Sequence, residues 1–115
     1  MRKIEAYSFF QGKRKAVKLL KDFISEPWLS IEEKSSAFIR LGYLLHDLEQ
    51  YEEASQYFHE GLLLGKEMPF PYSSYFPLMF EAFKKAQRHD LYEFWYEDFV
   101  KRRSYDEAFG NVEAE

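Results

Sequence analysis

Residues 38–61, FIRLGYLLHDLEQYEEASQYFHEG, decide the fold of this chain. Apolar side chains recur three and four positions apart on both sides of a short polar break at residues 48–50, which predicts two helices joined by a turn. Gly42 stands in the first helix, and Ala54 follows twelve positions later in the second. Small residues at these places let two antiparallel helices cross closely, while larger side chains fill the space around the crossing. The stretch therefore predicts a tightly packed helix pair.

The same stretch resembles a tetratricopeptide repeat, a helix pair that stacks in arrays. Seven positions agree with that family's pattern in one register, and they are Phe38, Leu41, Gly42, Leu45, Ala54, Phe58 and Gly61. Lys66 departs from the pattern, because the family expects a closing proline there. The resemblance covers residues 35–65 and implies about three stacked helix pairs, the central one closest to consensus. An ordinary helix hairpin with a small-residue contact is the alternative.

The segment before the central pair predicts two helices separated by a glycine. Apolar periodicity predicts a short helix near residues 4–10, a break at Gly12 and a firmer helix over residues 13–24. Ser30 is followed three positions later by Glu33, which is the pattern of a capping box. This box predicts where the first helix of the central pair begins.

The segment after the central pair predicts a break in helical structure. Gly65 is expected to stop the second helix in a left-handed conformation. Pro69 and Pro71, one residue apart, prevent a helix and favour an extended chain. Ser73 or Ser74 then caps the next helix.

Two further helices are predicted in the C-terminal third, the first ending near residue 87 and the second covering residues 91–103. In the last pair the position of the small residue falls on Phe94, which is expected to hold the two helices apart. The chain is thus predicted to be all-α, with antiparallel helix pairs stacked as a short array. Residues 1–104 are expected to form a single domain and residues 105–115 a frayed tail.

Length and composition exclude several classes of protein. The chain has 115 residues, about one domain's worth, and 46% of them are hydrophobic. It has no cysteine, which excludes a disulfide scaffold, thiolate zinc sites and cysteine catalysis. No apolar run approaches the roughly 20 residues that cross a bilayer, and the first ten residues lack the apolar stretch of a secretory signal. A cytoplasmic location is therefore expected.

Motifs of catalysis and metal binding are missing from the sequence. It contains no glycine-rich phosphate loop, no His-Glu-x-x-His and no Gly-x-Ser-x-Gly. His46 and His89 each precede an aspartate, but both lie at expected helix ends. There a histidine interacts with free carbonyls and an aspartate caps the next helix. We therefore expect no enzymatic activity, no cofactor and no metal site.

The resemblance implies a role in protein–protein interaction, because the first helix of each such pair lines a concave, peptide-binding surface. The predicted partner-binding residues here are Ile39, Arg40, Tyr43 and His46, with Ser36 on the same line. Many relatives bind a C-terminal carboxylate with Lys and Asn at the places of Ile39 and Tyr43, so that mode is not supported. The apolar and aromatic lining favours an amphipathic helix or an extended apolar peptide. Alternatively, these side chains pack on neighbouring helices of the same chain.

Aromatic residues make up 20% of the chain and crowd into its second half. Three of them on the last helix exceed what one short neighbour covers, and they are Phe94, Trp95 and Phe99. Large exposed apolar patches rarely persist on monomers. We therefore expect a two-fold homodimer through residues 75–103. The alternative is a compact monomer in which Phe70 and Tyr72 fold over the other aromatic side chains.

Positive charge gathers at the N-terminal end of an otherwise acidic chain. Residues 1–21 carry seven basic residues and one acidic residue, whereas the formal net charge of the chain is −4. Such asymmetry indicates an anionic partner, a solvated face or contact with the acidic half of the same chain. The alternative function is a regulator that binds nucleic acid, although the acidic balance disfavours this role. The cations concerned are Lys13, Arg14, Lys15, Lys18 and Lys21.

Overall fold

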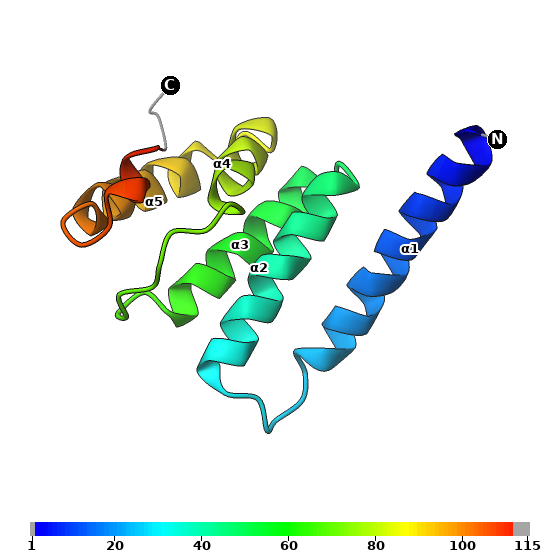
Figure 1. Cartoon of the computed structure of the whole chain (residues 1–115), viewed down its shortest axis with the longest axis horizontal. Coiled ribbons are helices and arrows are strands. Elements are labelled where there is room, and N and C mark those ends of the chain that lie inside the picture. The colour runs from blue at the N-terminus through cyan, green and yellow to red at the C-terminus, as the bar shows by residue number, and fades with distance from the viewer. Residues whose placement is uncertain (1, 112–115) are drawn as a thin grey trace.

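The computed structural model describes residues 2–111 and the side chains of residues 11–110. Over these residues the chain forms five α-helices, one short 3₁₀-helix and no strand. They are α1 (Arg2–Phe23), α2 (Ile31–Asp47), α3 (Tyr51–Leu64), α4 (Phe76–Lys85), α5 (His89–Arg102) and η1 (Glu107–Asn111). The helices follow one another across the molecule from α1 to α5, with extents of 47 × 37 × 23 Å (Figure 1). The predicted all-α class with antiparallel helix pairs is confirmed.

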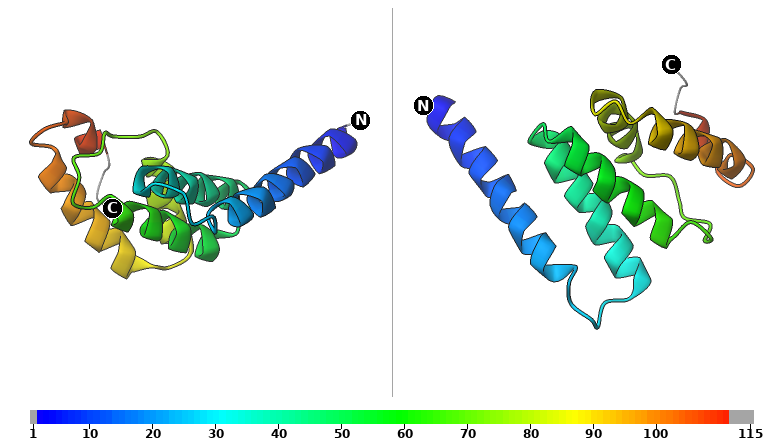
Figure 2. Two further views of the ribbon diagram at one scale, coloured as in Figure 1. Left: turned by 90° about the horizontal axis from the view of Figure 1, so that it is seen from below. Right: turned by 180° about the vertical axis from the view of Figure 1, so that it is seen from behind.

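The expected break at Gly12 is wrong, because α1 runs through this residue without interruption. Gly12 is exposed, and a Cβ atom built on it would meet nothing within 4 Å. A glycine inside a helix costs about 1 kcal/mol relative to alanine, which helical segments on both sides can offset. The side chains of residues 4–10 lie outside the described residues. The array therefore consists of α1, without a helix partner of its own, followed by the pairs α2–α3 and α4–α5 (Figure 2).

The predicted capping box opens α2. The Ser30 hydroxyl accepts a hydrogen bond from the Glu33 N–H over 3.1 Å, and the Glu33 carboxylate accepts one from the Ser30 N–H over 3.0 Å. Bonding to the backbone and side chain of Ser30 lowers the pKa of the Glu33 carboxyl. α3 begins directly after the predicted turn at residues 48–50 and ends at Leu64. Gly65 follows it with φ of −107°, so the expected left-handed stop is wrong: here the helix ends in a tighter turn, with the Gly65 N–H donating to the carbonyl of Leu62.

The first pair crosses at two glycines. A Cβ atom on Gly42 would lie 2.7 Å from the ring of Phe58, and one on Gly61 would lie 2.9 Å from the Cβ of Phe38. Neither distance leaves room for a side chain, and Ala54 beside the crossing is fully buried. The separation of α2 and α3 is therefore set by residues that carry little or no side chain.

In both pairs the two helices are joined by the same kind of turn. Glu49 lies between α2 and α3 with φ of 61°, and Gln87 lies between α4 and α5 with φ of 59°. In each turn the following N–H donates to the carbonyl five positions earlier, over 2.9 Å in the first turn and 2.8 Å in the second. This is a Schellman arrangement with a left-handed residue other than glycine. The turn geometry thus repeats along the chain.

The second pair crosses on aromatic side chains. When the two turns are aligned, Phe80 and Phe99 stand where the first pair has Gly42 and Gly61. The Phe80 and Phe99 rings lie 5.3 Å apart between centroids, edge to face, and both are buried. Aromatic rings therefore fill the space between α4 and α5. At the corresponding positions of the first pair, glycines let α2 and α3 approach closely.

The expectation that Phe94 holds the last two helices apart is wrong. Its side chain is 43% exposed and lies beside His59 and Trp95. The alignment of the turns assigns the corresponding position to Tyr92, whose ring centroid lies 4.9 Å from that of Phe80. The error is one of register, because α5 begins at residue 89 rather than 91.

The segment between the pairs and the C-terminal residues cover this aromatic core. The ring of Phe70 lies 6.0 Å from that of Phe109, and the ring of Tyr72 lies 5.3 Å from it. Phe109 is almost completely buried, so residues up to 111 are folded against the domain instead of forming the frayed tail expected over 105–115. Burial of a large apolar side chain offsets the entropy cost of ordering these residues. Residues 112–115 lie outside the described residues.

The start of α4 also differs from expectation. Its N-cap position is Tyr75, without a side-chain hydrogen bond, rather than Ser73 or Ser74. The Ser73 hydroxyl instead accepts from the Tyr75 N–H over 3.1 Å, which closes a turn just ahead of the helix. Pro77 is accommodated in the first turn, because the N–H that it lacks has no partner there in any helix.

Candidate functional site

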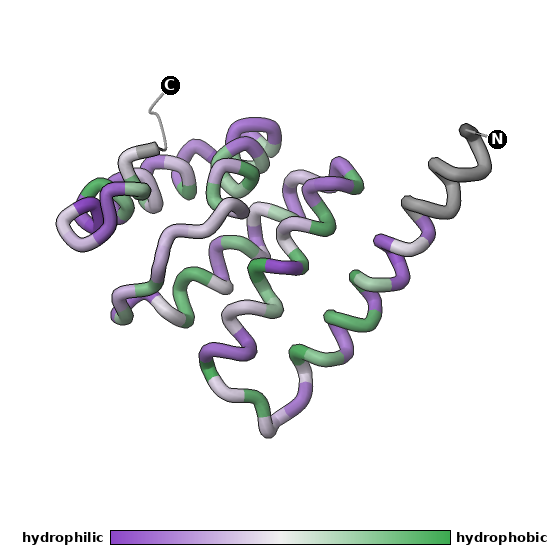
Figure 3. Tube along the Cα trace, in the orientation of Figure 1, coloured by the Kyte–Doolittle hydropathy of each residue, from purple (hydrophilic) through white to green (hydrophobic). Residues whose placement is uncertain are grey.

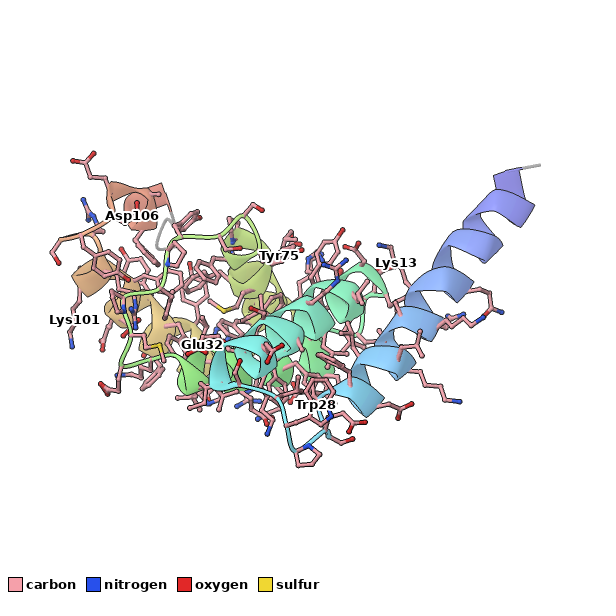
Figure 4. All side chains as sticks on the ribbon, turned by 60° about the horizontal axis from the view of Figure 1, so that its bottom comes forward. Lys13, Trp28, Glu32, Tyr75, Lys101 and Asp106 are labelled. Atoms are coloured by element: carbon pink, nitrogen blue, oxygen red, sulfur yellow. The ribbon has the colours of Figure 1, made fainter. Side chains whose placement is uncertain are left out.

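A pocket of about 360 Å³ opens between the first half of α2 and residues 62–76. Its α2 wall consists of Ile31, Glu32, Ser35, Ser36 and Ile39. Spacings of three and four place these residues on one face of the helix. The opposite wall includes Met68, Phe70, Pro71, Ser73 and Tyr75. Figure 4 labels Glu32 on α2 and Tyr75 just before α4.

Prolines give the opposite wall its shape. Pro69 and Pro71 prevent a helix, so residues 68–73 pass the array without regular structure. An extended chain is thinner than a helix and fills less of the space beside α2. The consequence is an open pocket whose lining is largely apolar.

Arg102 of α5 holds this wall in place. Its buried guanidinium donates to the carbonyls of Lys66 and Met68 over 2.6 and 2.8 Å, and to the Asp98 carboxylate over 2.6 Å. It also lies 3.7 Å from the centre of the Phe70 ring. Although burial opposes its charge, the hydrogen bonds and charge of its partners raise the pKa of Arg102. The wall is therefore fixed by charge-assisted bonds.

Two residues of the predicted binding line reach the pocket. Ser36 is exposed at its mouth, and Ile39 is buried at its lining. Arg40 is exposed one turn beyond Ser36, outside the lining residues. The predicted binding residues and the pocket lining thus overlap in the first half of α2.

The other two predicted binding residues pack within the chain. The Tyr43 ring lies 5.0 Å from that of Tyr75 between centroids, and Nζ of Lys13 on α1 lies 5.3 Å from the centre of the Tyr43 ring. His46 contacts the carboxylate of Glu81 on α4 and lies 3.4 Å from that of Asp47. For these two positions the expected alternative, packing on neighbouring helices, describes the structure.

Lys13 completes this polar contact between α1 and α2. Its Nζ lies 2.9 Å from Oδ2 of Asp47. Burial opposes the ionisation of Asp47, but hydrogen bonds from Lys13 and His46 outweigh it and lower the pKa of the carboxyl. The contact orders the end of α2 that is farthest from the pocket.

The proposed dimer residues Trp95 and Phe99 are fully buried inside the chain, so they are unavailable as an interface. The Trp95 indole N–H donates to Nδ1 of His59 over 2.9 Å, and Phe70 packs at the edge of Phe99. Of the two residues expected in the alternative to fold over the aromatic side chains, Phe70 packs on Phe99, and Tyr72 packs on Phe76 and Phe109. Of the three dimer candidates, Phe94 remains partly exposed.

The basic residues of α1 whose side chains are described, all within residues 13–21, divide into two groups. Lys13 and Lys21 form ion pairs with Asp47 and Glu53, the second over 2.6 Å. The hydrogen bond to Glu53 raises the pKa of Lys21 despite partial burial. The remaining cations are exposed and form no ion pair among the described residues, and they are Arg14, Lys15 and Lys18.

Within the described part of the chain, no three histidine or carboxylate side chains gather to hold a metal ion, and no helix is long and apolar enough to cross a membrane. Sequence reasoning missed Met68, Phe70 and Tyr75 as pocket residues. The available signal was the run of apolar residues interleaved with Pro69 and Pro71, which lines a surface only because tertiary contacts hold it against α2.

Comparisons of the chain with protein-family models, with curated proteins and with solved structures found no match.

Proposed function

We propose that this protein is a non-enzymatic interaction module that binds a peptide or helix of another protein through the pocket between α2 and residues 62–76. The observation that carries the proposal is an apolar pocket left open to water. Ile31 is 53% exposed at its edge, and Met68 on the opposite wall is also exposed. Exposed apolar groups around a concavity with a polar rim are typical of binding sites.

The rim supports a preferred direction for the bound segment. Glu32 and Arg40 lie on the exposed side of α2, eight residues or about 12 Å apart along the helix. A peptide along α2 therefore meets a carboxylate at one end and a guanidinium at the other. Its apolar side chain enters the pocket between them, beside Ser36.

We also propose that the fold is related to tetratricopeptide repeats, whose first helices line peptide-binding surfaces. The close glycine crossing of α2 and α3 and the repeated turn support this relation. One departure is the spacing of the turns at Glu49 and Gln87, which is 38 residues rather than 34. The longer spacing includes residues 65–75, the segment that supplies the second wall of the pocket.

Selection from a displayed library of random peptides tests the proposal. The protein is expected to enrich sequences with a large apolar residue between a basic and an acidic flank. Ser36→Trp places an indole in the mouth of the pocket and is expected to abolish binding of the enriched peptides. Gln56→Trp introduces the same side chain at an exposed position of α3 outside this pocket, so it serves as the control and is expected to bind normally. Equal binding by both variants, or no enrichment, would refute a site at this pocket.

Nucleic-acid binding through α1 has less support, because Lys13 and Lys21 are engaged with carboxylates of the same chain. Binding of this kind depends steeply on salt, whereas binding in an apolar pocket does not. Retention of a DNA or RNA duplex at low salt, lost on charge reversal of Lys15, would favour that function instead.

A further inference from the structure

The outer face of α1 combines exposed apolar and basic side chains. α1 packs against α2 on one side, and its other side faces away from the array (Figures 1 and 2). Leu19 is 63% exposed, and Trp28 beyond the end of the helix is 65% exposed. Figure 3 shows apolar residues along this part of α1, and of these Leu19 and Phe23 are exposed whereas Val17 is buried. Arg14 and Lys18 lie one turn apart on the same open side.

The outer face of α5 carries the opposite charge. Glu93 and Glu97 are exposed one turn apart, and the exposed apolar side chains beside them are Phe94 and Val100. Neither carboxylate forms an ion pair with a described residue, whereas Asp90 nearby is engaged with Arg88. α5 therefore presents an acidic and partly apolar surface.

Each of these faces carries a like-charged pair, with one opposite charge a turn further along: Asp22 follows Lys18 on α1, and Lys101 follows Glu97 on α5. Like charges four positions apart destabilise a helix by a few tenths of a kcal/mol. α1 has such a pair in Arg14 and Lys18, and α5 has one of opposite sign in Glu93 and Glu97. Each pair lies beside exposed apolar side chains, whose burial favours association.

From this complementarity we propose that α1 of one copy of the protein packs against α5 of a second copy. The two helices are the first and last of the array, so the contact joins different surfaces of the two copies. Such contacts extend head to tail instead of closing as a two-fold dimer. This replaces the expected interface at Trp95 and Phe99, and no residue of α1 or α5 lines the pocket beside α2.

A charge-swap experiment tests the contact. One variant carries Arg14→Glu and Lys18→Glu, and the other carries Glu93→Lys and Glu97→Lys. Sedimentation velocity from micromolar to millimolar concentration is expected to show growing species for the parent protein at low salt and smaller ones at high salt. Each variant alone places like charges together and is expected to weaken association at least tenfold. Their equimolar mixture restores opposite charges at both contacts and is expected to associate like the parent.

The matched control carries Glu49→Lys and Glu107→Lys, exposed changes with the same effect on net charge as the α5 variant. It is expected to associate like the parent. Circular dichroism of all variants confirms folding before the comparison. A parent that remains monomeric throughout, a reversal without effect, or a mixture that does not associate would each overturn the proposal.

Other occupants of the α1 face are separate outcomes of the same set of variants. Anionic phospholipid vesicles, a DNA duplex and a helical poly-glutamate peptide are the probes. Binding of any of them that is lost with Arg14→Glu and Lys18→Glu, in a parent that does not self-associate, would assign the face to that partner and overturn self-assembly.

Discussion

The same kind of turn joins the two helices in α2–α3 and in α4–α5, but the helices of the two pairs cross in different ways. Glycines at 42 and 61 bring the first pair close together, and phenylalanines at 80 and 99 fill the second. The turn that joins two helices therefore does not determine the distance between them. Side-chain volume at two positions of the crossing determines it. Adding volume is expected to break the first pair, and removing volume is expected to break the second.

The largest effect is expected from Phe99→Ala in the second pair. Phe99 is fully buried, with Phe76 and Phe109 about it at centroid distances of 5.0 and 4.9 Å. Its removal leaves a cavity and is expected to lower the free energy of unfolding by about 3–5 kcal/mol in urea denaturation. Phe94→Ala, at an exposed position of the same helix, is the control and is expected to cost less than about 1 kcal/mol. Equal costs would mean that α5 presents a different face to the core.

The opposite change is expected to damage the first pair. Gly42→Leu forces a side chain against the Phe58 ring and is expected to cost about 1–3 kcal/mol or more. Ala54→Leu is expected to behave alike. Gly12→Leu provides the control, since this glycine is exposed and its replacement is expected to stabilise α1 by up to about 1 kcal/mol. Equal melting temperatures for Gly42→Leu and Gly12→Leu would contradict the close crossing of α2 and α3.

The hydrogen bond between Trp95 of α5 and His59 of α3 links the two pairs, and its contribution to stability is expected to depend on pH. His59 of α3 accepts the indole N–H of Trp95, and burial, aided by the charge of Arg88, lowers the pKa of His59 below its ordinary value of 6.5. The unfolded chain therefore takes up a proton at higher pH than the folded chain. This contribution to stability is fully present above pH 6.5 and is lost as pH falls toward the lower pKa of the folded state.

Thermal melts across this pH range measure the effect. His59→Asn keeps an acceptor for the indole but does not titrate, so it is expected to show a weaker decline in melting temperature on acidification. His46 and His89 are present in both proteins, so their contributions cancel in the comparison. An unchanged pH profile would show that His59 does not carry the dependence.

The smallest effects concern the feature that the pairs share. Glu49 and Gln87 adopt the left-handed conformation that glycine adopts without steric cost. The left-handed conformation costs residues other than glycine about 1–2 kcal/mol, and the greater entropy that glycine loses on folding offsets about 0.5–1 kcal/mol of this gain. Glu49→Gly and Gln87→Gly are each therefore expected to stabilise the protein by up to about 1 kcal/mol, and by similar amounts. Chemical denaturation of both variants measures this. A gain at one turn and a loss at the other would show that the two turns are not equivalent.

Local signals were sufficient to predict much of the fold. The Ser30–Glu33 cap and the glycine crossing at Gly42 depend on neighbours within one helix pair, and both were predicted correctly. The start of α5 was misplaced by two residues, because the turn before it uses Gln87 in a left-handed conformation instead of glycine. Such a turn leaves no signal in the sequence.

The candidate site was predicted only in part. Ser36 and Ile39 follow from helical spacing along α2, whereas the second wall depends on contacts that are distant in sequence. Arg102 bonds to carbonyls about 35 residues before it and fixes residues 66–70 in place. No local pattern predicts that pairing. Proline spacing indicates that this segment is not helical, but it does not indicate which helix the segment faces.

We propose that the pocket beside α2 accepts an apolar side chain from outside the protein. Methyl NMR of isoleucine-labelled protein during addition of N-acetyl-leucine amide tests it most directly. Ile31 and Ile39 line the pocket, whereas Ile24 packs on the core elsewhere and serves as an internal reference. Saturable shifts of the Ile31 and Ile39 methyl signals are expected, with the Ile24 signal unchanged, and these shifts are expected to be lost in Ser36→Trp. Methyl signals that do not move, or that all move together, would contradict it.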